Sequence, residues 1–174
     1  MQLDNQILTE RLSAFGIDAN TRHNLALLRR ELAASIDEVI AGFYAHFNRI
    51  PSANIHFAGP MLTRLQQRQR AHWLEMFECR FDQHYVANAI RIGRAHFDHK
   101  VPPRLYLAGQ SHFQCSLISL AASKFGTSRD LPVLLASITR IIALDTDLAF
   151  SAYTRAFWTA APATSRRESN EVWV

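Results

Sequence analysis

The sequence predicts a single all-α domain. Apolar residues recur every three or four positions through most of the 174 residues, which is the period of an amphipathic helix. Only 6 glycines and 6 prolines are present, fewer turn-forming residues than an all-β chain of this length normally uses. Apolar residues make up 48% of the chain and charged residues 20%, which indicates a globular core rather than a disordered chain.

The first third of the chain predicts a short leading helix followed by a long helical stretch. The leading helix is expected to end at Gly16, and Asp18 or Thr21 is expected to cap the next one. Apolar positions then continue in steps of three or four as far as Phe47, as one bent helix or two, and Pro51 stops them. Residues 51–59 are expected to form a loop.

Four more helices are predicted after this loop. Pro60 suits the start of the first, and Asp82 can cap the second. Pro102 and Pro103 prevent that helix from continuing and begin another, over about 103–125. A turn at Gly126 leads to the last long helix, over about 131–160. The polar segment 161–174 is expected to be a tail or the start of a linker, which leaves residues 1–160 as the domain.

Charge and cysteine content argue against several classes of protein. The net charge is +4, but arginines are scattered in short clusters, whereas nucleic-acid binding usually needs a concentrated basic stripe. The two cysteines, Cys79 and Cys115, form no zinc-binding or disulfide pattern. Neither a membrane-spanning apolar run nor a signal-peptide pattern is found, so we expect a cytoplasmic protein that binds neither membranes nor nucleic acid.

A few polar residues occupy positions where the helical stripes should be apolar. They are Tyr44, Gln66, Gln69 and His96. Each can be a boundary residue with its tip in water, or the four can converge on a ligand, because a buried polar group needs a partner. Gly93, one turn before His96, would let a flat cofactor approach the backbone, and neutral imidazole is a good ligand for haem iron.

Three motifs carry a resemblance to a known family. Residues 92–109 read IGRAHFDHKVPPRLYLAG, residues 42–47 read GFYAHF, and residues 69–77 read QRAHWLEMF, with DQHY following at 82–85. Together they resemble the globin-coupled sensors, the bacterial haem domains that control chemotaxis receptors, diguanylate cyclases and histidine kinases. The family pattern is Ile-Gly-x-x-His followed by Pro-x-x-Tyr, and the resemblance covers about residues 18–157.

The resemblance implies a globin fold with an extra N-terminal helix and a haem-based oxygen sensor. His96 would be the axial ligand of haem b, and Tyr44 and Gln69 would face bound O2, CO or NO. Tyr106 would contact the axial histidine. The expected haem-binding set comprises Phe43, Tyr44, Phe47, Leu65, Gln66, Gln69, Trp73, Ile92, Gly93 and Tyr106.

The sequence departs from the family pattern in two places. Gln66 and Gln69 stand where the family commonly has leucine and a small hydroxyl residue, so the distal side should be more polar. Lys100 stands where the family usually has glycine, so the turn after His96 must be made without it. A six-coordinate iron stays open, because further histidines are available at His46, His72 and His99.

The resemblance also implies a homodimer, formed by the last two long helices, that passes the signal to an output domain. Candidate contacts are Leu117, Leu120, Ile138, Ile142 and Tyr153, with an internal core as the alternative. Asp145 on the same stripe would be costly in a dry interface unless it is paired. The chain itself is expected not to be an enzyme. The alternatives are a globin that removes nitric oxide or peroxide, and a haem-free globin-fold signalling scaffold.

Overall fold

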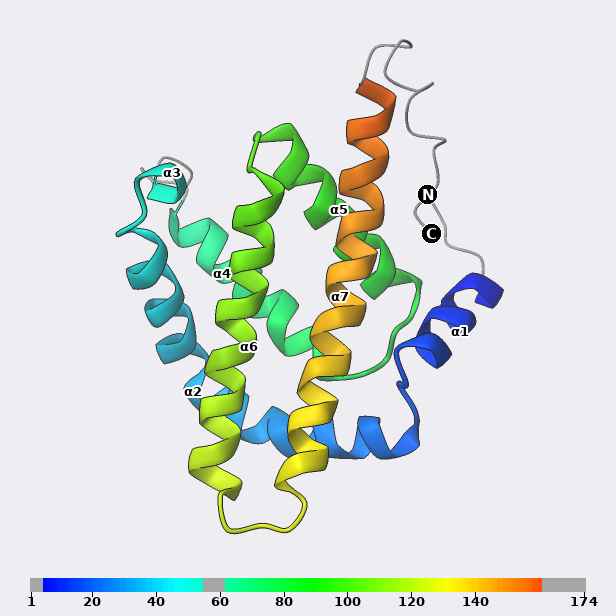
Figure 1. Cartoon of the computed structure of the whole chain (residues 1–174), viewed down its shortest axis with the longest axis vertical. Helices are drawn as coiled ribbons and strands as arrows, with labels where there is room; N and C mark the ends of the chain where they lie inside the picture. The colour runs from blue at the N-terminus through cyan, green and yellow to red at the C-terminus, as the bar shows by residue number, and fades with distance from the viewer. Residues whose placement is uncertain (1–4, 55–61, 161–174) are drawn as a thin grey trace, which may run out of the picture.

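The computed structural model confirms the all-α prediction and describes residues 5–54 and 62–160. Seven helices are found in these two ranges (Figure 1). They are α1 (Asn5–Ala14), α2 (Ala19–Phe47), α3 (Pro51–Asn54), α4 (Leu62–Met76), α5 (Gln83–Asp98), α6 (Pro103–Phe125) and α7 (Leu131–Ala160). Within the described residues, none of these helices has the length and apolarity needed to cross a membrane.

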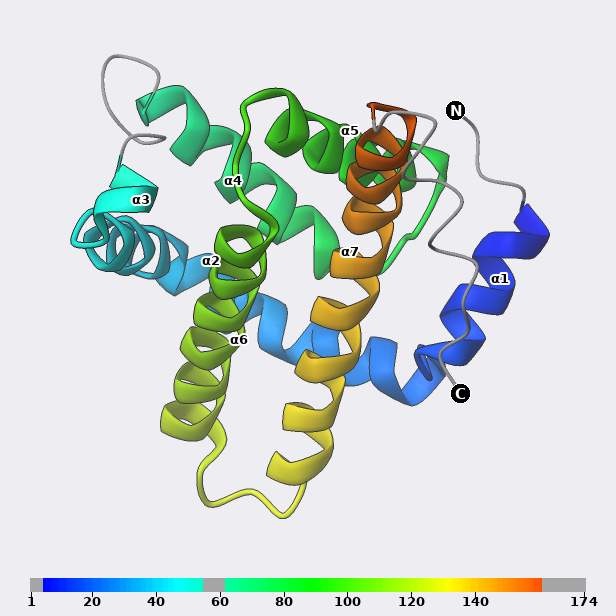
Figure 2. The same cartoon turned by 45° about the horizontal axis from the view of Figure 1, so that its top comes forward.

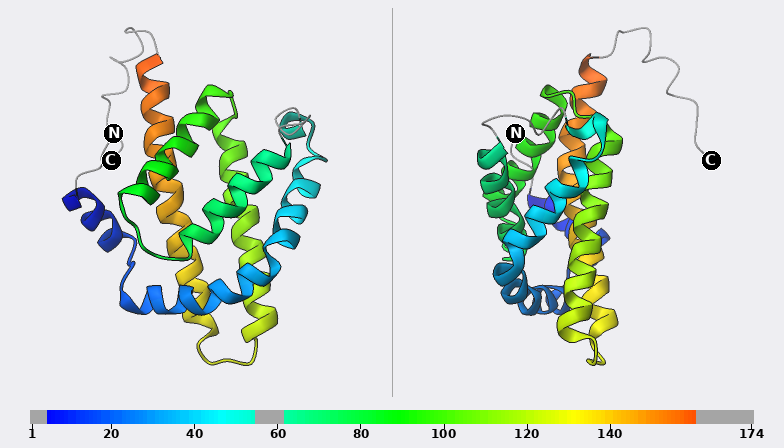
Figure 3. Two further views of the ribbon diagram at one scale, coloured as in Figure 1. Left: turned by 180° about the vertical axis from the view of Figure 1, so that it is seen from behind. Right: turned by 90° about the vertical axis from the view of Figure 1, so that its left-hand side faces the viewer.

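The two long C-terminal helices form the centre of the arrangement. In Figure 1, α6 and α7 run side by side and antiparallel, joined by a short turn. Seen from behind in Figure 3, α4 and α5 cross this pair, and α5 packs against α7. Figure 2 shows α2 passing behind α7 and α6, and Figure 1 shows it bending upward toward α3. The start of α4 and the end of α5, which carries His96, therefore lie at the same end of the molecule.

Local capping signals fixed most helix boundaries as predicted. Asp18 caps α2 by accepting a hydrogen bond from the Thr21 backbone nitrogen at 2.7 Å. Asp82 caps α5 in the same way, with the Tyr85 nitrogen 2.9 Å from its carboxylate. Gly16, with φ of +64°, follows the end of α1, a left-handed conformation that suits glycine.

The structure differs from the predicted N-terminal half in one segment. Residues 51–54 form the short helix α3 rather than a loop, because the fixed φ of Pro51 suits the first position of a helix. The long stretch before it is a single bent helix, α2. Pro60 and the tail 161–174 lie outside the described residues.

The expected dimer contacts turn out largely to belong to the core of a single chain. Leu117, Ile138 and Ile142 are 2%, 0% and 3% exposed and are buried within one chain, so the prediction that they face a partner is wrong. Leu120 is half-buried and packs against the same core, and the side chain of Tyr153 lies outside the described set. A helical stripe marks the apolar face, but it does not show which chain covers it.

Candidate haem site

One face of α6 brings the predicted haem residues of three other helices together. The contacts are Tyr106 with His96 of α5, Gly109 with Phe43 of α2, and Phe113 with Trp73 of α4. The last pair stacks with ring centroids 3.6 Å apart and an interplanar angle of 6°. These three residues of α6 are spaced three and four apart, so they share one side of the helix. Helix α6 is therefore the common support of the candidate site.

His96 has the hydrogen bond that suits an axial ligand. Its Nδ1 lies 2.8 Å from the carbonyl oxygen of Ile92, one turn earlier on α5. A carbonyl oxygen only accepts, so the proton of the neutral ring is on Nδ1 and the lone pair is on Nε2. Tyr106 holds the ring from one side, with centroids 4.8 Å apart and ring planes at 80°. His96 is half-buried, whereas its rival His99 is exposed at the end of α5.

The aromatic residues of α2 form the buried wall on the other side of the candidate site. Phe43, Tyr44 and Phe47 are all buried, and the Phe43 ring lies 5.6 Å from Trp73. Burial raises the pKa of Tyr44 to about 12. The phenol therefore keeps its proton at neutral pH and can donate a hydrogen bond to a ligand.

The polar positions on α4 contain an unsatisfied atom. Leu65, Gln66 and Gln69 are half-buried. Within the described residues, the side-chain oxygen of Gln69 is buried and has no hydrogen-bond partner. Leaving such a group unpaired costs about 1–3 kcal/mol, so a buried orphan of this kind needs an explanation. An amide oxygen only accepts, and neither a porphyrin face nor O2 donates, so a haem would not satisfy this atom. The fit to a haem rests instead on His96, whose bond to Ile92 leaves the lone pair on Nε2.

Gly93 has a packing role that differs from the predicted one. A Cβ atom at this position would lie 1.9 Å from the carbonyl oxygen of Ala149 on α7. The glycine is therefore required by the close approach of α5 and α7, whereas the sequence interpretation assigned it to the approach of a cofactor. This packing holds the helix that carries His96 directly against α7.

Lys100 makes the turn after His96 in a conformation that normally belongs to glycine. Its φ is 55°, in the left-handed region. Lys100 donates its backbone N–H to Phe97 at 2.9 Å, and Val101 donates to His96 at 2.9 Å, which together form a Schellman motif. The predicted turn without glycine is confirmed, and it places strain directly after the helix of the candidate ligand.

Substituting Lys100 by glycine should stabilise the protein. A left-handed residue with a side chain costs about 1–2 kcal/mol, and the extra chain entropy of glycine removes part of the gain. We expect Lys100→Gly to raise the free energy of unfolding by about 0.5–1 kcal/mol in urea denaturation. Lys100→Ala keeps the strain and is the control. If Lys100→Ala raised the free energy of unfolding as much as Lys100→Gly, the gain would come from the loss of the lysine charge and not from relief of the left-handed φ.

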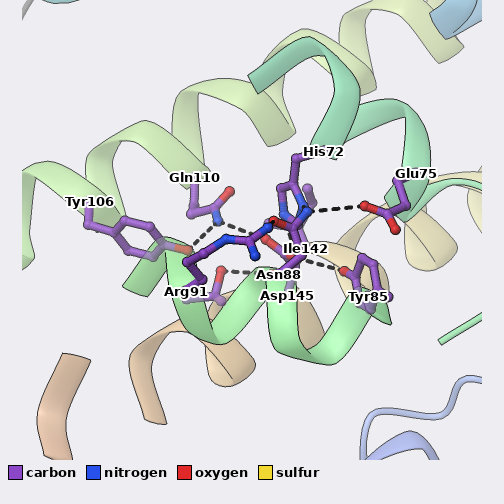
Figure 4. Close-up of polar contacts among 10 residues, drawn as sticks. His72, Glu75, Tyr85, Asn88, Arg91, Tyr106, Gln110, Ile142 and Asp145 are labelled. Atoms are coloured by element: carbon purple, nitrogen blue, oxygen red, sulfur yellow. Dashed lines mark hydrogen bonds and ion pairs between the residues drawn. The ribbon is translucent and has the colours of Figure 1, made fainter. Parts of the chain in front are cut away.

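A buried polar network lies next to the candidate site and links α4, α5, α6 and α7 (Figure 4). At its centre, the Nε2 atom of His72 lies 2.9 Å from Asp145, and both side chains are buried. Asp145 is therefore paired inside the chain, as its burial requires. The Nε2 atom of His72, one of the histidines available as a further iron ligand, is therefore already engaged in a hydrogen bond with Asp145. The other candidate, His46, stacks on His112 with centroids 4.5 Å apart.

The sequence indicated that Asp145 needs a partner but did not identify His72. Burial alone would lower the pKa of His72, but the Asp145 carboxylate more than offsets this and raises it. Burial alone would raise the pKa of Asp145, but the charge and hydrogen bond of His72, with Tyr85 and Gln110, hold it below its ordinary value. Each partner thus favours the charged form of the other.

The stability given by this pair should depend on pH with a predictable sign. The contribution of His72 is complete below its ordinary pKa of 6.5 and declines as the pH rises through the higher folded value. The contribution of Asp145 is present above 3.8 and is lost as the pH falls through the lower folded value. The advantage of the wild type over His72→Gln in urea denaturation should therefore shrink as the pH rises above 6.5. An advantage that grows over this range would contradict the assignment.

The helix arrangement defines a globin fold. The structure superimposes on the globin domain of a Geobacter sulfurreducens globin-coupled sensor with a TM-score of 0.77 and 16% sequence identity, covering 83% of this chain and 96% of that one. The Protoglobin family model matches residues 4–158, and the chain belongs to this family. The resemblance to globin-coupled sensors is thus confirmed.

A curated relative extends the comparison to a longer protein. The chain is 28% identical over 122 residues to the heme-based aerotactic transducer HemAT of Halobacterium salinarum. The match covers 69% of this chain and 25% of the relative. The chain therefore spans about a quarter of the length of that transducer.

Proposed function

We propose that this domain is a haem-based gas sensor that binds haem b through His96 and takes O2 as its signal. The observation that carries the proposal is the His96 ring, whose hydrogen bond to Ile92 leaves the lone pair on Nε2. The name of the curated relative, a heme-based aerotactic transducer, supports the same function. When bound, the haem iron would supply the coordination position at which O2, CO or NO is taken up.

The residues of this chain would divide the remaining tasks between them. Tyr106 orients the ring of His96, and the buried aromatic residues of α2 with Trp73 exclude water from one side. Leu65, Gln66 and Ile92 are half-buried and would complete the lining. Tyr44 and Gln69 would donate hydrogen bonds to the gas ligand, since the phenol stays protonated and the amide has two N–H groups.

Absorption spectra of the purified protein in three states test the proposal. Protein expressed with a supply of haem should show a Soret band in the ferric state that shifts on reduction and again on addition of O2. A protein that stays colourless after incubation with haem would favour the haem-free scaffold instead. Sustained consumption of nitric oxide with a reductant would favour the enzyme.

Tyr44→Phe should release O2 faster. The substitution removes one hydrogen-bond donor, worth about 0.5–1.5 kcal/mol, which corresponds to a roughly two- to tenfold higher dissociation rate. Stopped-flow displacement of O2 by CO measures the rate. Release of CO serves as the control ligand because it gains less from a donor. Unchanged O2 release would contradict the role of Tyr44.

We also propose that the domain dimerises through the outer faces of α6 and α7 and passes its signal to an output domain. Leu107, near the start of α6, and Val133, near the start of α7, are large apolar residues that are 47% and 51% exposed. These residues replace the buried leucine and isoleucines as candidate contacts. A dimer mass in sedimentation at micromolar concentration supports this proposal, and a monomer contradicts it.

A further inference from the structure

The carboxylate of Asp145 gathers hydrogen bonds from three other helices. His72 of α4 and Tyr85 of α5 lie 2.9 and 2.6 Å from one of its oxygens, Oδ1. Gln110 of α6 donates to the other oxygen, Oδ2, at 3.3 Å. Asp145 is 3% exposed and its contacts with His72 and Tyr85 are buried, whereas Gln110 is half-buried. Figure 4 shows these contacts together. Hydrogen bonds to an ionised group in such surroundings are stronger than ordinary ones.

Gln110 extends this network toward the candidate axial ligand. Its Nε2 donates to the hydroxyl oxygen of Tyr106 at 2.9 Å as well as to Asp145. The ring of Tyr106 in turn stands edge-on to His96. A continuous series of contacts therefore leads from a buried carboxylate on α7, through an amide and a phenol on α6, to the imidazole on α5.

We propose that Asp145 and Gln110 are positioning residues for the proximal side of the haem, acting through Tyr106 on His96. The inference rests on the proposed function and adds to it two residues outside the expected haem-binding set. Gln110 holds the phenol of Tyr106, and Tyr106 limits the rotation of the His96 ring. Asp145 holds Gln110 and ties the proximal side to α7. The strength of the iron–histidine bond would thus depend on Gln110, two contacts from His96, and on Asp145, three contacts from it.

An isosteric amide at position 145 would reverse the direction of hydrogen bonds in this network. Asp145 accepts on both oxygens, whereas asparagine has one acceptor oxygen and one amino group. If that oxygen keeps the contacts with His72 and Tyr85, the amino group faces the amino group of Gln110. Two donors repel each other, so Gln110 must turn its amide. Its contact with Tyr106 is then made by Oε1, which accepts from the hydroxyl, instead of by Nε2, which donates to it. The substitution also removes the charge that favours the protonated form of His72, so the buried pair loses one negative and one positive charge together.

A matched pair of variants tests the contribution of Gln110. Gln110→Met removes the amide that bridges Asp145 and Tyr106, with little change in side-chain volume. Gln114→Met is the control, because Gln114 lies one turn later on α6 and also bonds α7, through the hydroxyl of Thr139 at 3.0 Å. The readout is the iron–histidine stretching frequency of the ferrous, ligand-free protein in resonance Raman spectra. We expect the band to shift or broaden in Gln110→Met and to stay as in the wild type in Gln114→Met.

A double-mutant comparison tests the route itself. In a Tyr106→Phe background, Gln110→Met should have no further effect on the band, because the hydroxyl that it contacts is gone. Asp145→Asn should also shift or broaden the band, because Gln110 must turn its amide to keep a bond to residue 145. This inference alone would be overturned if haem-loaded Gln110→Met kept the iron–histidine band of the wild type. It would also be overturned if Gln110→Met shifted the band equally in the wild-type and Tyr106→Phe backgrounds. A wild type that binds no haem would overturn the proposed function together with it.

Discussion

Replacing His96 by alanine should give a folded protein that no longer binds haem with a normal spectrum. The imidazole would supply the axial bond to the iron, and the three histidines considered as further ligands have other contacts or are exposed. His72 is held by Asp145, and His46 is stacked on His112. The side chain of His96 is half-buried near the end of α5, so its loss should reduce stability only modestly.

The measurement combines absorption spectra with circular dichroism of the same samples. The His96→Ala variant should lose the ferrous Soret band of the wild type while keeping its helical signal, and added imidazole should restore part of the band. His99→Ala is the matched control, because this exposed histidine lies three residues later on the same helix end. A wild-type spectrum in His96→Ala, or its loss in His99→Ala, would reassign the ligand.

Features set by a few neighbouring residues could be predicted from the sequence. Asp18 and Asp82 cap their helices through bonds to nitrogens three residues ahead, so the residue type and the hydrophobic stripe were sufficient. The same holds for Pro103 at the start of α6. The turn at Lys100 was expected only from the family resemblance, because lysine itself does not favour a left-handed conformation. The order of the helices followed, and with it the α5 position of His96.

Features that depend on distant partners could not be predicted in this way. Asp145 required a partner, but that partner, His72, lies 73 residues away, and no local pattern connects them. The stripe of Leu117 and Ile138 was compatible with a dimer interface and with an internal core, because both bury the same side chains. Only the packing of α2 and α5 against α6 and α7 shows that the chain covers this stripe itself.

The role of Gly93 shows the same limit and leads to the second large prediction. Its place one turn before His96 suggested space for a cofactor, whereas its α-carbon lies against the backbone of α7. An added methyl group would come within 1.9 Å of the Ala149 carbonyl oxygen and 2.7 Å of its carbon. Backbone atoms cannot turn away as a side chain can, so α5 and α7 would have to separate.

Gly93→Ala should therefore destabilise the protein by about 3 kcal/mol or more, and it should do so with or without haem. Thermal unfolding followed by circular dichroism should show a midpoint lowered by roughly 6–12 °C for a chain of this length. Gly42→Ala is the matched control, since Gly42 lies within α2 with no atom within 4 Å of the added group. That change should instead stabilise by about 0.5–1 kcal/mol through helix propensity. The packing role would be contradicted if Gly93→Ala had the thermal stability of the wild type without haem and failed only to take up haem. The glycine would then be required by the cofactor, because only a bound group would occupy the space beside it.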